Sequence, residues 1–461
     1  MVGRYKPYSE YKDSGVEWLG DVPGHWGSVP IKYMALESES LFLDGDWIES
    51  KDISGEGIRY ITTGNVTNGK YREQGAGYIT EDTFLKLNCT EVLEGDVLIA
   101  RLNDPIGRAC IVPNLESKIV TSVDNVIFRP DKKYHKNYLV HLFSSEGYFR
   151  HTGNLARGAT MQRISRGLLG NIRIVTPLFE EQEKIANFLD HETAKIDTLI
   201  EKQQQLIQLL KEKRQAVISH AVTKGLNPVA KLRDSGVEWL GEVPEHWIVA
   251  GFKKYLNSIV DYRGKTPEKH DSGVFLVTAR NIKSGAINYD ASQEYISEDD
   301  YESVMCRGKP KIGDLLFTTE APLGEVASVD REDIALAQRV IKFDGQPGIL
   351  NNFYLKYLIM SMQFQQSLMM FSSGSTAPGI KAERFVYLRS LIPPLSEQLE
   401  IIDYIESVAK KIDNLIVKAI DGIEIMQERR TALISAAVTG KIDVRGWVAP
   451  QDSPTHKEVA A

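Results

Sequence analysis

Cysteine and long apolar runs are both scarce in this sequence, which narrows the class of protein. The 461 residues include only three cysteines, Cys89, Cys110 and Cys306. An odd, scattered set does not form a disulfide framework and indicates a reducing compartment, and no cysteine and histidine stand at zinc-ligand spacing. No segment approaches the roughly 18 apolar residues of a membrane span, and the N-terminus lacks the apolar core of a signal peptide. The sequence therefore predicts a cytoplasmic protein.

Excess positive charge is missing too. The net charge is −7, so any nucleic-acid-binding function has to use local basic patches. One such patch exists, because residues 147–179 contain five arginines and no acidic residue. Arginine, asparagine and glutamine are side chains that contact phosphates and read base edges. Composition alone leaves a solvated basic face open as the alternative.

Motifs of nucleotide and metal chemistry are absent or incomplete. Gly264-Lys265-Thr266 resembles the end of a phosphate-binding loop, but Ile259 stands where that loop needs a glycine. Residues 103–106 (NDPI) resemble the amino-methyltransferase motif without its second proline and its aromatic residue. No glycine-rich loop suits S-adenosylmethionine, and Asp131 has no second acid at the spacing of a nuclease site. We therefore predict no catalytic residue, no metal site and no cofactor in this chain.

A duplication dominates what the sequence does contain. Residues 13–26 (DSGVEWLGDVPGHW) and 234–247 (DSGVEWLGEVPEHW) differ at only two positions, so the chain consists of two tandem copies of one unit. We interpret Trp18, His25 and Trp26 as residues that pack against the rest of the unit where it begins, in preference to residues that contact a ligand. We call the repeated fourteen-residue segment the clasp.

Each copy ends in a long helical run, at residues 181–222 and 397–438. Apolar residues recur at steps of mostly three and four, the period of a coiled-coil seam. The predicted seam comprises Ile185, Leu189, Ile196, Ile200, Leu206, Leu210 and Val217, and then Ile405, Val408, Ile412, Leu415, Ala419, Ile423, Met426, Leu433 and Ala437. A lone helix would leave this stripe in water, so the runs are expected to pair. The second run must return the chain, so the pairing is antiparallel.

Between clasp and helix, each copy is rich in short strands. Residues 58–66 match 274–282, and residues 94–101 match 312–319, as strands that end in polar turns. Helical stretches are expected near 137–151 and 351–371. This mixture of many short strands with few helices predicts an α+β fold.

The polar turns are the candidate nucleic-acid contacts, because loops can carry side chains into a groove while the sheet stays rigid. In the first copy the candidates are Thr62, Asn65, Arg101, Asn103, Arg108, Arg157, Thr160, Gln162, Arg163 and Arg166. In the second copy they are Arg263, Lys265, Thr278, Arg280, Asn281, Thr376 and Lys381.

In their duplicated order, these pieces resemble the DNA-specificity subunits of type I restriction-modification systems. The resemblance rests on the fourteen-residue clasp, the Gly-x-Thr-x-x-x-Ile turns at 158–164 and 374–380, and the IS-x-AVT helix ends. It implies two strand-rich target-recognition domains joined by two antiparallel coiled-coil helices with pseudo-two-fold symmetry. The implied segments are the domains at 1–180 and 226–396, the spacer helices at 181–225 and 397–441, and a tail at 442–461.

The resemblance also implies a function and partners. Each domain would read one half of a bipartite double-stranded DNA target, and the helix pair would set the non-specific gap. Two modification (methyltransferase) subunits and two restriction (motor-nuclease) subunits would supply catalysis, using S-adenosylmethionine, ATP and magnesium. Apolar residues outside the predicted seam are expected to dock the modification subunits: Phe188, Leu199, Ile401 and Ile416.

Two other classes of function remain open at this stage. A coiled-coil scaffold would assemble proteins without binding DNA, although the local basic patch and the duplicated polar turns argue against it. A self-contained methyltransferase or nuclease would need the cofactor and metal motifs that are incomplete here.

Overall fold

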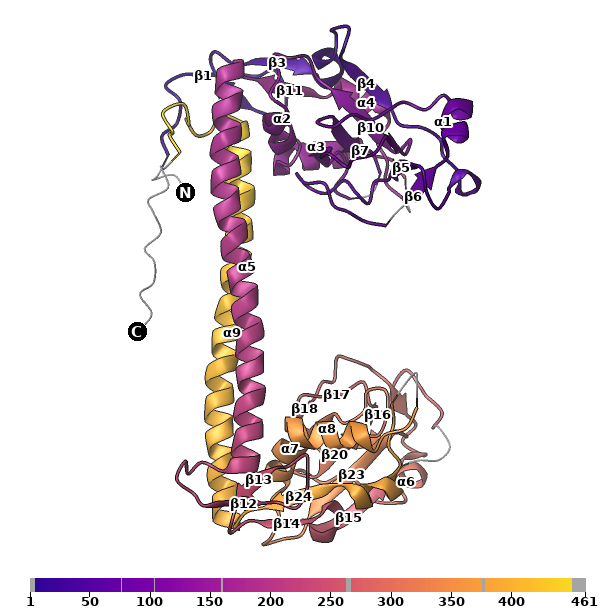
Figure 1. The fold of residues 1–461 in the computed structure, drawn as a ribbon, viewed down its shortest axis with the longest axis vertical. Coiled ribbons are helices and arrows are strands. Elements are labelled where there is room, and N and C mark those ends of the chain that lie inside the picture. The colour runs from indigo at the N-terminus through magenta and orange to yellow at the C-terminus, as the bar shows by residue number, and fades with distance from the viewer. Residues whose placement is uncertain are drawn as a thin grey trace. The chain divides into compact units, whose positions relative to one another are not determined.

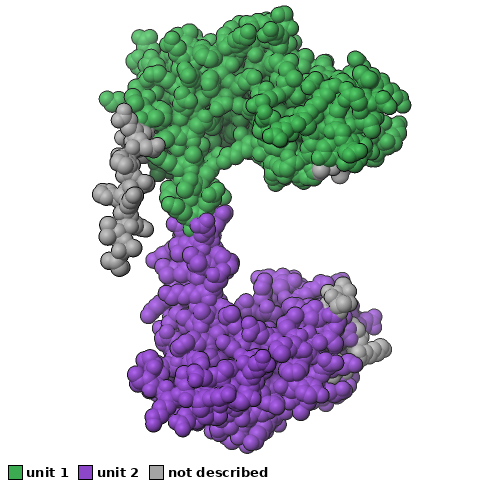
Figure 2. All heavy atoms as spheres, in the orientation of Figure 1, with its two compact units in different colours: residues 1–202, 421–461 green, residues 203–420 purple. Residues whose placement is uncertain are grey.

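The computed structural model describes residues 5–75, 77–102, 104–158, 161–262, 267–374 and 378–449. The chain forms two compact units, unit 1 (residues 1–202 and 421–461) and unit 2 (residues 203–420) (Figure 2). Each unit combines a strand-rich domain with part of each of two long helices, α5 (Phe179–Lys224) and α9 (Leu395–Val438) (Figure 1). We call the residues before α5 domain 1 and those between α5 and α9 domain 2. Within the described ranges, no helix has the length and apolar character to cross a membrane.

Domain 1 is built on two small sheets. A four-stranded antiparallel sheet has the order β4-β10-β7-β8, and a three-stranded sheet has the order β6-β5-β9, in which β5 and β9 are parallel. The strands β1–β2 and β3–β11 form two further pairs. The strands are β1 (Tyr11–Asp13), β2 (Asp21–Pro23), β3 (Gly27–Pro30), β4 (Leu41–Asp44), β5 (Ile58–Ile61), β6 (Gly77–Ile79), β7 (Val97–Ala100), β8 (Ala109–Ile111), β9 (Ile119–Thr121), β10 (Asn125–Arg129) and β11 (Arg173–Thr176).

Short helices complete domain 1. They are η1 (Ile31–Met34), η2 (Ser50–Asp52), α1 (Glu81–Leu87), α2 (Lys136–Leu142), α3 (Glu146–Leu155) and α4 (Arg166–Asn171). The aromatic side chains of Phe128, Tyr138, Phe143 and Tyr148 are fully buried, in the same core cluster as the first turns of α5. The domain and its end of the helix pair therefore share one hydrophobic core.

Domain 2 repeats this plan. Its sheets have the orders β15-β23-β20-β21 and β19-β16-β22, with β16 and β22 parallel, and β12–β13 and β14–β24 form pairs. The strands are β12 (Leu232–Asp234), β13 (Glu242–Pro244), β14 (Ile248–Gly251), β15 (Leu256–Asp261), β16 (Val274–Val277), β17 (Ile282–Lys283), β18 (Ala286–Ile287), β19 (Tyr295–Ile296), β20 (Leu315–Thr318), β21 (Val326–Ser328), β22 (Ile334–Leu336), β23 (Val340–Gly345) and β24 (Arg389–Ile392). The helices are η3 (Phe252–Tyr255), α6 (Tyr301–Val304), α7 (Asn352–Met360), α8 (Met362–Met370) and η4 (Ala382–Tyr387).

The α+β class and the duplicated strands are confirmed, but the two expected helical stretches are each interrupted. In domain 2 the break falls at Ser361, which has an extended backbone (φ −65°, ψ 148°). Its hydroxyl accepts a hydrogen bond from the Phe364 amide at 3.3 Å and so caps α8. Domain 1 has the same break at Ser145, between α2 and α3.

The repeated fourteen-residue segment packs as a clasp. Trp26 and Trp247 are fully buried, one in each unit. A Cβ atom on Gly440, just after α9, would lie 3.2 Å from the ring of Trp26, and one on Gly225, just after α5, would lie 3.2 Å from the ring of Trp247. Each tryptophan therefore packs against the end of the helix that arrives at its unit. The packing interpretation is confirmed for these residues.

A duplicated tyrosine shows that the helices run antiparallel. The Tyr138 hydroxyl donates to the carbonyl of Val175, just before α5 begins, and to that of Val438 at the end of α9. The Tyr354 hydroxyl donates to Leu391, just before α9 begins, and to Val222 near the end of α5. In each unit, therefore, one long helix starts beside the end of the other.

At two positions, the residue that lies in the seam between the helices is the one after the residue that we predicted. Leu206 and Leu415 were expected inside, but their side chains are 43% and 50% exposed. The neighbouring Ile207 and Ile416 are half-buried instead. Ile207 lies three residues before the buried Leu210, and Ile416 lies four residues after the buried Ile412, so both keep the alternating steps of a heptad.

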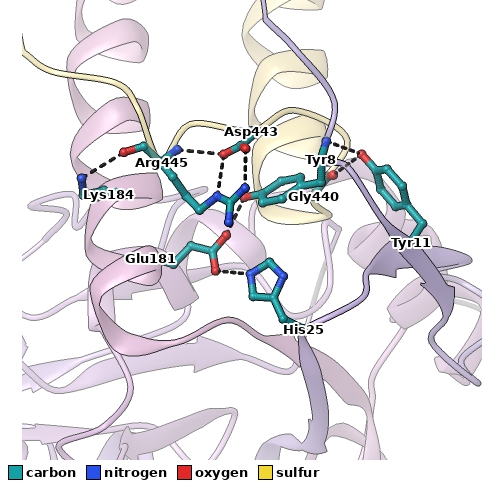
Figure 3. A network of polar contacts seen from close by, with 8 residues as sticks. All are labelled: Tyr8, Tyr11, His25, Glu181, Lys184, Gly440, Asp443 and Arg445. Atoms are coloured by element: carbon teal, nitrogen blue, oxygen red, sulfur yellow. Dashed lines mark hydrogen bonds and ion pairs between the residues drawn. The ribbon is translucent and has the colours of Figure 1, made fainter.

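The C-terminal segment returns to unit 1 (Figure 3). The Asp443 amide donates to the Lys6 carbonyl at 2.8 Å, and Val444 is buried in the core of unit 1. The Lys184 ammonium donates to the Arg445 carbonyl at 2.9 Å, and the Tyr11 hydroxyl donates to the Gly440 carbonyl at 2.9 Å. These contacts join both ends of the described chain to the start of α5.

The corrected seam gives a matched pair of variants. Ile416→Asp places a charge in the half-buried seam and should lower the free energy of unfolding by roughly 2 kcal/mol or more. Leu415→Asp changes an exposed neighbour and should alter it by about 0.5 kcal/mol or less. Urea denaturation followed by circular dichroism measures both. Equal destabilisation by the two variants would show that this seam register is wrong.

Candidate nucleic-acid interface

Three loops meet at one edge of domain 1. The Arg101 amide, after β7, donates to the Asp124 carbonyl in the β9–β10 turn at 2.8 Å, and the Ile164 amide donates to the Arg101 carbonyl at 3.0 Å. Paired backbone hydrogen bonds between Arg157 and Arg163 close a hairpin. Gly158 begins its tip with φ +118°, where a Cβ atom would lie 2.3 Å from the Met161 carbonyl oxygen, so this position requires glycine.

Domain 2 brings the equivalent loops together through the same backbone contacts. The Thr319 amide donates to the Arg339 carbonyl at 2.9 Å, and the Ile380 amide donates to the Thr319 carbonyl at 2.9 Å. Ser373 and Gly379 close the second hairpin. The backbone frame of the candidate interface is therefore the same in both domains, although the side chains on it differ.

Alternating charges line the interface of domain 1. Arg163 pairs with Asp124 at 2.8 Å, and its side chain is 42% exposed. Arg166 lies 3.7 Å from Asp44, which also pairs with Arg101 at 3.1 Å. The two carboxylates hold the guanidinium groups in place, while Arg163 and Arg166 keep surface for a ligand. The sequence pattern predicts neither aspartate, because clustered positive charge marks these loops, whereas isolated carboxylates give no such signal.

Arg101 and Arg108 have structural roles in place of the direct DNA contact that we expected. Both are less than a tenth exposed. The Arg108 guanidinium donates to the carbonyls of Val66 (2.7 Å), Thr63 (2.9 Å) and Leu102 (3.0 Å). Desolvation by burial lowers the pKa of both side chains. Arg101 pairs with Asp44 and donates to the Ile164 carbonyl at 3.4 Å. Both arginines therefore tie the loops of the interface to one another.

Asn65 and Asn281 are likewise buried, with 1% and 0% of their surface exposed. The Asn65 Oδ1 accepts from the Thr62 amide at 3.0 Å, and its Nδ2 donates to the carbonyl of Arg72 at 3.1 Å. Asn281 repeats both contacts in domain 2. The expectation that these amides read bases is therefore corrected, because their polar atoms already shape the turns.

Several other candidates are accessible. Arg157, Gln162 and Arg163 lie on the exposed hairpin of domain 1, Thr62 is exposed on the first turn, and Arg280 and Lys381 are exposed in domain 2. Thr278 is partly buried, and its hydroxyl donates to Asn281 at 2.8 Å. Five candidates lie outside the described residues: Asn103, Thr160, Arg263, Lys265 and Thr376.

The four candidate docking residues lie in three different environments. Phe188 and Ile401 are fully buried in the cores of their units, so their assignment to an external surface is wrong. Ile416 belongs to the seam, as described above. Leu199 is the most exposed of the four, with 50% of its surface accessible. Its counterpart 216 residues on (415 − 199) is Leu415, which is also 50% exposed.

Comparison with known proteins identifies relatives. A family model for the type I restriction modification DNA specificity domain matches residues 41–209 and again residues 254–424. The putative type I restriction enzyme MjaX specificity subunit of Methanocaldococcus jannaschii is 22% identical over 444 residues, which are 93% of this chain and 96% of that protein. The MjaVIII specificity subunit of the same organism is 25% identical over 63% of this chain and 66% of its own length. This chain therefore spans just under two thirds of the MjaVIII protein.

Solved structures share the fold. The HsdS subunit from Thermoanaerobacter tengcongensis superposes with a TM-score of 0.51 at 15% identity, covering 91% of this chain and 98% of the other. A chain from a structure on complex assembly and conformational transition of the type I R-M system superposes with a TM-score of 0.67 at 15% identity, covering 91% and 99%. At such low identity, the likeness concerns the fold alone.

The role given to Asn65 leads to a stability prediction. Asn65→Ala removes the acceptor of the Thr62 amide and should lower the free energy of unfolding by about 1–3 kcal/mol. Asn68→Ala, three residues away on the exposed part of the same turn, should change it by about 0.5 kcal/mol or less. Thermal and urea unfolding measure both variants. Wild-type stability in the Asn65 variant would contradict its structural role.

Proposed function

This chain belongs to the type I restriction-modification DNA-specificity family, and from that premise we propose that each domain reads one half of a bipartite double-stranded DNA target. The chief support is the interface frame, in which the same backbone hydrogen bonds hold the same three loops in both domains. The residues on that frame differ: Met161-Gln162-Arg163 in the first hairpin stands where the second has Ala377-Pro378-Gly379. Because the two domains carry different side chains on the same backbone frame, they are suited to reading two different half-site sequences.

The chemistry of the exposed side chains fits base reading. Arginine donates two parallel hydrogen bonds to guanine. Glutamine can contact adenine with two hydrogen bonds, donating one to N7 and accepting one from the N6 amino group. Arg163 is positioned for such a contact because Asp124 holds its guanidinium while part of it stays exposed. Phosphate contacts from neighbouring arginines would add affinity that does not depend on sequence and weakens with salt.

We assign the gap between the half-sites to the helix pair. Heptad packing of α5 against α9 fixes the register of the two helices within each unit. The Arg430–Asp197 ion pair (2.8 Å) in unit 1 has its counterpart in Arg214–Asp413 (3.6 Å) in unit 2. Both pairs link one helix to the other, so they oppose sliding of the seam.

Catalysis is assigned to partner subunits. Two modification subunits would use S-adenosylmethionine, two restriction subunits would use ATP and magnesium, and the present chain would need no cofactor. The three free cysteines fit the reducing cytoplasm in which such a complex would meet cellular DNA. The alternative, a scaffold without DNA binding, makes a different prediction, because such a protein would select no sequence from a random duplex pool.

Single arginine substitutions test the assignment of one domain to one half-site. Arg163→Ala should reduce discrimination at one base position of one half-site by about 5–150-fold, equivalent to 1–3 kcal/mol, and leave the other half-site unchanged. Arg280→Ala should do the same for the other half-site. Sequencing of bound duplexes, at several salt concentrations, measures both effects.

Arg150→Ala is the matched control for this test. Arg150 belongs to the same basic segment but pairs with Glu146 on an exposed helix face, so base preferences should stay unchanged. If either arginine variant alters both half-sites, the one-domain, one-half-site assignment fails.

Partner docking has its own test at Leu199 and Leu415. These equivalent exposed leucines, one in each unit, suit two copies of a modification subunit. Leu199→Asp with Leu415→Asp should abolish co-purification with modification subunits and leave the melting temperature of the free chain unchanged. Gln204→Asp, at an exposed polar position of α5, should still assemble. Normal assembly of the double variant would exclude these leucines from the docking surface.

A further inference from the structure

The turn between β22 and β23 in domain 2 occupies the position of the β9–β10 turn in domain 1. In each domain, the carbonyl of one turn residue accepts a hydrogen bond from the amide of the first residue after an inner strand of the four-stranded sheet. This strand is β7 in domain 1 and β20 in domain 2. These acceptors are Asp124 in domain 1 (2.8 Å from the Arg101 amide) and Arg339 in domain 2 (2.9 Å from the Thr319 amide). Arg339 is therefore the counterpart of Asp124, with the opposite charge.

The ion-pair partner of this turn residue also has the opposite charge in the two domains. In domain 1 the hairpin carries the guanidinium, Arg163, and the turn carries the carboxylate. In domain 2 the hairpin position holds Gly379, which forms a bridge with Glu320, and the Glu320 carboxylate pairs with the Arg339 Nε at 2.7 Å. In both domains, therefore, a carboxylate holds a guanidinium within the same loop frame, but the arginine comes from the hairpin in domain 1 and from the turn in domain 2.

The surroundings of Arg339 can receive a ligand. A cavity of about 210 Å³ lies beside it, and its lining includes Lys269, Thr278, Arg280 and Gln338. The Arg339 side chain is 51% exposed. Within the described ranges, Arg280 and Gln338 have no hydrogen-bonding or ion-pair partner, so their donors are available. Guanidinium and carboxamide groups are the groups that read base edges.

The backbone of Arg339 adds an independent argument. Its φ is +75°, in the left-handed region that favours glycine. Holding a non-glycine residue there costs roughly 1–2 kcal/mol, and such strain concentrates at functional sites. An arginine at this position is explained if its side chain is needed.

We propose that Arg339, with Arg280 and Gln338 beside it, forms the base-reading site of domain 2, with guanine as the base that Arg339 contacts. Glu320 is a positioning residue that holds the guanidinium, as Asp124 holds Arg163 in domain 1. This inference rests on the proposed function, because it requires that domain 2 reads DNA.

Arg339→Gly is the decisive variant, because glycine adopts the left-handed backbone without strain and the fold should be at least as stable. Selection from a random duplex pool by the full chain with its modification subunits should show a 5–150-fold loss of discrimination at one G·C pair of one half-site. The half-site read through Arg163 should be unchanged. Thermal unfolding checks that the variant is folded.

Arg331→Gly controls for the lost charge. Arg331 precedes β22, whereas Arg339 follows it, and Arg331 pairs with the exposed Asp333, so this variant should keep every base preference. Glu320→Gln should release the guanidinium of Arg339. Affinity for non-specific DNA should then rise, and discrimination at the same G·C pair should decrease. A structural role alone would not produce that combination.

The outcomes separate the two proposals. If the wild-type complex selects no sequence, the proposed function itself fails. If the wild type selects two half-sites and Arg339→Gly selects the same two with equal discrimination, domain 2 reads DNA without Arg339, and the present inference is overturned.

Discussion

The Glu-Gln pair in the first turn of each long helix holds each unit together. Glu181 accepts a hydrogen bond from the Tyr8 hydroxyl at 2.7 Å and pairs with His25 at 2.8 Å, while Gln182 accepts from the His135 amide at 2.8 Å. Gln398 repeats the last contact in unit 2. These side chains are buried or nearly so, and water cannot replace their partners without a desolvation cost. Clasp, domain and helix are therefore fixed to one another at one point in each unit.

Such an anchor leaves the loops of the candidate interface free to vary. The loops there are held by backbone hydrogen bonds, which do not depend on side-chain identity. A guanidinium can therefore stand on the hairpin in domain 1 and on the β22–β23 turn in domain 2 without any change of fold. Under the proposed function, this separation of a constant backbone frame from variable side chains would let the DNA target change without a change of fold.

The helices show the limit of periodicity as a guide. Their existence, antiparallel pairing and approximate ends were predictable from apolar spacing and the duplicated termini. The seam was not, because Leu206 and Ile207 are both apolar, as are Leu415 and Ile416, so either residue of each pair satisfies a step of three or four. Packing against the partner helix selects the isoleucine in both pairs and leaves the leucines exposed.

By itself, the sequence determined that the protein is a tandem duplication with α+β domains and two long helices, because identity and hydrophobic period are local properties of the chain. Only the tertiary structure decided which polar residues are available to a ligand. Asn65 and Arg108 have the residue types of DNA contacts, but burial directs their hydrogen bonds to the backbone. Arg339 lies in no recognised motif, and it reaches the interface because strands distant in sequence bring its turn beside the hairpin. The physical reason is that hydrogen-bonding capacity belongs to a side chain, whereas its availability depends on what packs around it.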